Sequence, residues 1–146
     1  MKSEEILKGI EELALSPIIG REKGSVLERM VIENKPRLIL EVGTFIGYSA
    51  ILMGMHLKTG KIISLEIAPQ AAVTARRNIE KAGLSGRIEI TVGDARQTIP
   101  RLKGKFDMVF LDAAKETYLI CLKLAEPKLS KKAVIVADNV KLFARE

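Results

Sequence analysis

Five short runs rich in Val, Ile, Leu and Phe recur along this chain, separated by turns and by segments with helical spacing. Runs of this length are typical of buried strands. Strands that alternate with helices over about 25 residues are joined by right-handed crossovers into a mostly parallel sheet covered on both faces. The pattern therefore predicts a doubly wound α/β fold. The expected strands occupy 37–42, 61–67, 87–92, 106–112 and 132–138.

Two amphipathic helices are predicted before the first strand. Apolar residues recur at helical spacing in 3–15, and a second helix ends before Pro36, because a residue preceding proline avoids the helical region. The second helix is expected to turn inward Val26, Leu27, Met30 and Val31. The length of 146 residues fits one domain, 1–146, with the N-terminal helices in 1–35 and the βα core in 36–146.

Charge and cysteine usage bear on partners and location, and a single cysteine makes the cytoplasm the expected compartment. The net charge of +6 leaves an anionic partner open, but the basic residues mostly alternate with acids, as on solvated helix faces. Cys121 is the single cysteine and has no disulfide partner, which favours a reducing compartment and a core position. We find no signal peptide and no run near the roughly 18 apolar residues of a membrane span, so no membrane partner is expected. His56 is the single histidine, and since no acid or cysteine lies near it in the sequence, a structural role is expected.

Acidic residues follow all five predicted strands. In open α/β sheets, ligands bind beyond the carboxyl ends of the strands, near the point where strand order reverses. Polar residues at those ends are therefore the candidates for function. They are Glu41, Glu66, Asp94, Asp112, and Asp138 with Asn139.

The turn after the first strand suits a nucleotide ligand. Gly43 and Gly47 have no side chains, which lets the backbone approach a ligand closely, although tight-turn glycines are an alternative. The G-x-G-x-x-G pattern is missing, which argues against NAD or FAD. Glu66 lies at the end of the second strand, about 20 residues beyond the turn, where an acid accepts hydrogen bonds from ribose hydroxyls.

Two further acids point to the rest of the ligand. Asp94 is placed to accept from an exocyclic amine such as adenine N6, with helix capping as the alternative. Glu41 lies beneath the glycine turn, where it can receive the ammonium group of an amino acid, directly or through water. An adenosine joined to an amino acid without phosphates is S-adenosylmethionine (SAM).

Five stretches of the chain occur in an order that resembles a known family. They are "LEVGTFIGYSA", "SLEIAP", "VGDARQTIP", "MVFLDAAKETY" and "VADNV". The chain is similar, from about Pro17 to Val140, to the metal-dependent O-methyltransferases that use SAM. That family includes the catechol and caffeoyl-coenzyme A enzymes and bacterial relatives that act on hydroxyuridine in tRNA. The resemblance implies a Rossmann-like methyltransferase sheet.

The resemblance also implies roles for individual residues. The divalent metal ligands would be Asp112, Asp138 and Asn139, and their oxygens form a hard site suited to Mg²⁺. Lys115 would receive the hydroxyl proton, because the metal beside it would disfavour the charged form of the Lys115 amine. Lys115 and Asp112 are therefore the expected catalytic residues. The implied cofactor contacts are Ile19, Glu41, Gly43, Phe45, Gly47, Ser49, Glu66, Ile67, Asp94, Ala95, Arg96 and Asp112.

The family continues after "DNV" with an antiparallel hairpin that completes the sheet and part of the acceptor pocket. The chain ends at Glu146, so this hairpin is expected to be missing. Either a second copy covers the exposed edge, as in a dimer, or the chain is a piece of a longer product.

Three functions remain open at this point. The leading one is Mg²⁺-dependent transfer of a methyl group from SAM to a hydroxyl of a small catechol-like or vicinal-diol acceptor. The second is methylation of hydroxyuridine in tRNA, to which the basic charge gives some weight. The third is SAM binding without turnover.

Overall fold

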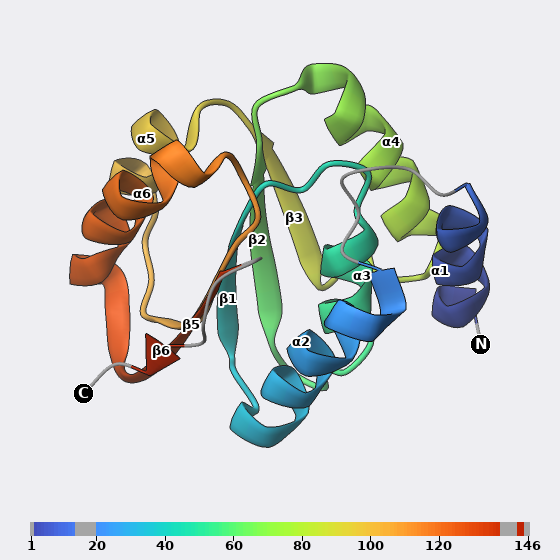
Figure 1. Cartoon of the computed structure of the whole chain (residues 1–146), viewed down its shortest axis with the longest axis horizontal. Helices are drawn as coiled ribbons and strands as arrows, with labels where there is room; N and C mark the ends of the chain where they lie inside the picture. The colour runs from blue at the N-terminus through green and yellow to red at the C-terminus, as the bar shows by residue number, and fades with distance from the viewer. Residues whose placement is uncertain (1, 14–19, 138–142, 145–146) are drawn as a thin grey trace.

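The computed structural model describes residues 2–13, 20–137 and 143–144, which form a six-stranded sheet between two layers of helices (Figure 1). The strands are β1 (Leu38–Val42), β2 (Lys61–Glu66), β3 (Ile88–Val92), β4 (Phe106–Leu111), β5 (Leu129–Ala137) and β6 (Phe143–Ala144). The α-helices are α1 (Lys2–Glu12), α2 (Gly20–Asn34), α3 (Tyr48–Gly54), α4 (Pro69–Lys81), α5 (Ala95–Thr98) and α6 (Tyr118–Ala125). Three short 3₁₀ helices are η1 (Ile99–Arg101), η2 (Lys115–Thr117) and η3 (Glu126–Lys128). None of these described helices is long and apolar enough to cross a membrane.

The strand order is β3-β2-β1-β4-β5-β6, and strands β1 to β5 are parallel. This confirms the predicted doubly wound fold. The order reverses between β1 and β4, so the crevice at their carboxyl ends is where this fold binds ligands. β6 pairs antiparallel with β5 and was not predicted, because a strand of two residues is too short to show an alternating pattern.

The central strands β1 and β4 bury both of their faces. Ile39 and Phe110 belong to the core beneath α1 to α4, whereas the next residues, Leu40 and Leu111, belong to the core beneath α5 and α6. Successive side chains of a strand point to opposite faces, so most positions of these two strands carry an apolar residue. Figure 1 shows α1 to α4 on one side of the sheet and α5 and α6 on the other.

Some predicted details were wrong. Val26 was expected to face inward but is 52% exposed. Leu27 and Val31, four residues apart, form the buried face of α2, and Val26 lies about 100° around the helix from Leu27. The first helix ends at Glu12 rather than Leu15, and Leu13 is exposed.

Ionic contacts hold the N-terminal helices together. Arg21, at the start of α2, forms salt bridges with Glu4 and Glu11 of α1 at 3.1 Å. His56 Nε2 lies 2.5 Å from a carboxylate oxygen of Glu28 in α2. The sequence offered no acidic neighbour for His56 because Glu28 is 28 residues away along the chain.

Gly43 lies where the turn after β1 meets the loop after β4. The Asp112 amide donates to the Val42 carbonyl at 2.8 Å, which brings the loop after β4 against the turn after β1. A Cβ atom on Gly43 would lie 2.2 Å from the Asp112 carbonyl oxygen, and the Gly43 φ angle is +100°. From the sequence, the missing side chain of Gly43 was expected to let a ligand approach the backbone. In the structure, the missing side chain lets the backbone of Asp112 approach.

Replacing Gly43 with alanine should therefore destabilise the fold and displace the loop at Asp112. We expect Gly43→Ala to lower the free energy of unfolding by about 3 kcal/mol, from backbone strain and overpacking together. Chemical denaturation would measure the change. Gly9→Ala is the control, since a Cβ at Gly9 meets no atom within 4 Å. Gly9 lies within α1, so this change should stabilise the chain by roughly 0.5–1 kcal/mol. Equal effects of the two substitutions would contradict the packing argument.

Candidate functional site

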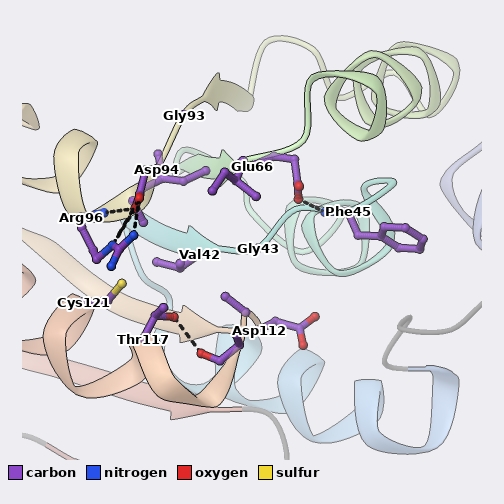
Figure 2. A pocket seen from close by; sticks show the side chains of 15 residues that line it. Val42, Gly43, Phe45, Glu66, Gly93, Asp94, Arg96, Asp112, Thr117 and Cys121 are labelled. Carbon is purple, nitrogen blue, oxygen red and sulfur yellow. Dashed lines mark hydrogen bonds and ion pairs between the residues drawn. The ribbon is translucent and has the colours of Figure 1, made fainter.

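A pocket of about 300 Å³ opens beyond the carboxyl ends of the central strands (Figure 2). Its walls come from the ends of β1 and β2, from the turns after β1, β2 and β3, from the loop after β4, and from α5, η2 and α6. The predicted cofactor residues that line it are Gly43, Phe45, Glu66, Ile67, Asp94, Ala95, Arg96 and Asp112. The topology thus brings together residues as far apart in the sequence as Gly43 and Asp112.

Glu66 is held in place by backbone amides. The Phe45 amide donates to Glu66 Oε1 at 2.6 Å, and the Ala68 amide donates to Oε2 at 3.0 Å. Phe45 adopts a φ angle of +50°, uncommon for a residue other than glycine, and its ring points away from the other lining side chains in Figure 2. An ionised carboxylate has about four acceptor positions, so two remain for a ligand.

Asp94 is already engaged by protein groups. Its Oδ1 accepts from the Arg96 backbone amide at 2.9 Å, which caps α5, and Arg96 Nη2 lies 2.7 Å from Oδ2. These contacts, first the Arg96 guanidinium and then its amide, lower the pKa of Asp94. Asp94 therefore caps a helix, as the alternative interpretation expected, and its contact with adenine stays a prediction.

Glu41 lies behind the pocket rather than in its wall. The Glu41 side chain has no exposed surface and accepts hydrogen bonds from the hydroxyls of Ser49 and Ser64. Burial raises the pKa of Glu41 to about 7, against the opposing effect of the two hydroxyls. Ser49 and Gly47 are also absent from the described lining, so contacts of these three residues with a ligand stay predictions.

The predicted metal site is only partly described. Asp112 lines the pocket, whereas Asp138, Asn139 and the cofactor residue Ile19 lie outside the described residues. Within 2–13, 20–137 and 143–144, no three His, Cys, Asp or Glu side chains are grouped to hold a metal ion. Leu111 and Ala137 are register partners in β4 and β5, so each of the two aspartates directly follows a paired residue at the same edge of the sheet.

Lys115 begins η2, is exposed and does not line the pocket, so its role as a base also stays a prediction.

The sequence missed one wall of the pocket. Thr117 and Cys121 line it, and Figure 2 shows the Cys121 sulfur directed toward Arg96. Cys121 was predicted to be core, and it is buried in the cluster beneath α5 and α6, where burial raises the pKa of its thiol. Thr117 and Cys121 are four residues apart, a spacing that places them on one side of a helical segment and could have indicated a shared surface. The other lining residues that were not predicted are Val42, Leu65, Gly93, Ala113 and Ala114.

Solved structures of methyltransferases share this fold. The O-methyltransferase from Bacillus cereus, in complex with SAH, superposes with a TM-score of 0.84 at 32% identity, over 94% of this chain and 66% of that chain. The O-methyltransferase TomG from Streptomyces achromogenes, in complex with SAM, gives a TM-score of 0.84 at 29% identity, over 94% of this chain and 65% of that chain.

Sequence comparison reaches the same group of proteins. Catechol O-methyltransferase of Sus scrofa is 38% identical over 130 residues, which cover 84% of this chain and 70% of that protein. The Niastella koreensis catechol O-methyltransferase is 36% identical over 137 residues, which cover 90% of this chain and 60% of that protein. The match covers only 48% of the Bos taurus catechol O-methyltransferase. A family described as O-methyltransferase matches residues 4–144, so the chain belongs to the O-methyltransferase family.

Proposed function

We propose that this chain provides the SAM-binding part of an O-methyltransferase that uses Mg²⁺ and methylates a hydroxyl of a small catechol-like or vicinal-diol acceptor. The observation that carries the proposal is the pocket beyond β1, β2 and β4, with Glu66 fixed in its wall by two amides. The carboxylate is oriented before any ligand arrives, which reduces the cost of ordering on binding.

The chemistry of the pocket matches the parts of SAM. Glu66 offers its free acceptor positions to the ribose hydroxyls, and the apolar side chains of Leu65, Ile67 and Cys121 line the rest of the wall. The related structures in complex with SAH and SAM support the same ligand. SAM supplies an activated methyl group on a positively charged sulfur.

The donor set fits a hard divalent cation. Asp112, Asp138 and Asn139 offer two carboxylates and an amide oxygen, the ligand type that suits Mg²⁺ and leaves positions for water and acceptor. Support comes from the register of β4 with β5, which pairs Leu111 with Ala137 immediately before the two aspartates. A cation held there would lower the pKa of an acceptor hydroxyl.

Lys115 is proposed as the group that takes the proton. In the transfer, the acceptor oxygen bonds to the methyl carbon, the carbon–sulfur bond breaks with its electron pair left on sulfur, and the hydroxyl proton passes to a base. Lys115 is three residues beyond Asp112, at the start of η2, which places an amine on the loop that carries a proposed metal ligand.

The relatives favour a small acceptor over tRNA. The curated relatives named above are catechol O-methyltransferases, and none of these names mentions RNA. A chain that bound SAM but transferred no methyl group to catechol-like acceptors would support the third function, SAM binding without turnover.

The first test concerns the ribose contact. Glu66→Gln replaces one acceptor oxygen with an NH₂ group that faces the amide of Phe45 or Ala68, so the side chain loses its fixed orientation. We expect the affinity for S-adenosylhomocysteine (SAH) to fall about tenfold by calorimetry, the cost of a hydrogen bond to a charged group. Methylthioadenosine, which keeps the ribose but lacks the amino acid, should weaken equally.

Glu89→Gln is the matched control, because Glu89 is an exposed acid on β3 that does not line the pocket. The control should bind SAH as the unsubstituted chain does. Wild-type affinity in the Glu66 variant would contradict the ribose contact, and an unsubstituted chain that binds no SAH would contradict the proposed function.

The second test concerns the metal. Asp112→Asn and Asp138→Ala should each weaken Mn²⁺ binding by at least about 100-fold, measured by electron paramagnetic resonance. Loss of a residue that only supports a metal ligand lowers metal affinity by up to about 100-fold, and loss of a ligand itself should cost more. Asp138→Ala should still bind SAH. Glu116→Gln, a change at an exposed acid of η2, is the control and should leave the metal affinity unchanged. Unchanged Mn²⁺ affinity in both aspartate variants would refute the metal site.

A further inference from the structure

A chain of hydroxyl groups surrounds the buried carboxylate of Glu41. Ser64 Oγ donates to Glu41 Oε1 at 2.5 Å, and Ser49 donates to Oε2. Thr44 Oγ1 lies 2.5 Å from Ser64 Oγ. All four side chains are buried, with exposed fractions of 4% or less. Glu41 and Ser64 are register partners in β1 and β2, so the sheet itself sets this contact.

The hydroxyls are arranged for the ionised form of Glu41. Since Ser64 gives its proton to Glu41, its oxygen is left to accept the proton of Thr44. Each hydroxyl proton therefore has an acceptor while Glu41 is charged. A protonated Glu41 would need an acceptor of its own, so Ser49 or Ser64 would have to turn its proton away.

No cation balances this charge within the described part of the chain. Its hydrogen-bond partners, Ser49 and Ser64, are neutral, and among residues 2–13, 20–137 and 143–144 the charged group that acts on it is Glu66, which has the same sign. An unbalanced buried carboxylate is costly, and accordingly burial raises the pKa of Glu41 to about 7. A ligand that brings a positive group to this end of the site would offset the cost.

Thr44 also connects the two acids of the site. It lies in the turn after β1, where its own amide donates to the Leu65 carbonyl at 3.2 Å. The amide of the next residue, Phe45, holds Glu66. The turn that orients Glu66 toward the pocket therefore also supplies the last hydroxyl of the chain that ends on Glu41.

We propose that Ser64 and Thr44 are positioning residues, which keep the Glu41 carboxylate ionised and directed toward Ser49 and thereby set the affinity for the ammonium group of SAM. This inference rests on the proposed function. Neither residue lines the pocket. Ser64 acts through its hydrogen bond to Glu41, and Thr44 acts through Ser64.

The test compares two ligands that differ at the amino-acid end. SAH carries the ammonium group, whereas methylthioadenosine keeps the adenosine and the thioether and lacks it. Ser64→Ala and Thr44→Val remove one hydroxyl each, and Thr44→Ser restores it. Ser25→Ala is a control at an exposed serine of α2. Affinities are measured by calorimetry from pH 6 to pH 9, with circular dichroism to verify folding.

The sign of the pH effect follows from the hydrogen bond. The Ser64 hydroxyl lowers the pKa of Glu41, so its removal raises that pKa above about 7 and leaves less of the carboxylate ionised at pH 7. We expect Ser64→Ala to bind SAH about fivefold more weakly at pH 7 and nearly normally at pH 9. Thr44→Val should show a smaller loss in the same direction. Thr44→Ser should restore the affinity, and methylthioadenosine should bind all variants alike.

Several outcomes would overturn the inference. An equal loss for SAH and methylthioadenosine, or a loss that is independent of pH, would mean a purely structural role. SAH affinity unchanged by both substitutions would also refute it. If the unsubstituted chain bound no SAH, both the proposed function and this inference would fail. If the unsubstituted chain bound SAH but the variants gave one of the contradicting results above, only this inference would fail.

Discussion

The hydrogen bond from the Asp112 amide to the Val42 carbonyl, with the close approach of Gly43 that it requires, underlies the whole site. It brings the loop after β4 against the turn after β1 at the point where the strand order reverses. The turn after β1 then presents the Phe45 amide to Glu66, and the loop after β4 carries Asp112 into the same pocket. A side chain at Gly43 would separate these two halves.

The acids at the strand ends are all carboxyl groups, but the groups that surround them differ. Glu66 is satisfied by backbone amides, Asp94 by an arginine, and Glu41 by hydroxyls alone. The contacts with Arg96 lower the pKa of Asp94, whereas burial raises the pKa of Glu41 against the opposing effect of its hydroxyl partners. Glu41 and Asp94, which look equivalent in the sequence, thus have pKa values shifted in opposite directions, because the fold buries one and pairs the other with an arginine.

Much of the fold could be predicted because it depends on local patterns. Apolar runs marked β1 to β5, and Pro36 marked the end of α2. Errors arose where the pattern was short or ambiguous. β6 has only two residues. Val26 is exposed and Leu27 is buried, but both are apolar, so the pattern did not show which one faces inward. The pairing of His56 with Glu28 and the place of Cys121 in the pocket wall depend on contacts between distant elements.

By itself, the sequence determined the alternation of strands and helices, the acids at the strand ends and the stretches that resemble the O-methyltransferases. These features are encoded by neighbouring residues, whose spacing is enough to reveal them. Only the tertiary structure decided which acid lines the pocket and which lies behind it. Glu41 and Glu66 both come at the end of a strand, but Glu41 is covered on all sides and Glu66 is at the pocket wall. That difference arises although both strands are paired on both edges. Glu41 is followed by a further strand residue and its carboxylate bonds to Ser49 and Ser64, whereas Glu66 is the last residue of β2 and its carboxylate bonds to amides at the pocket wall.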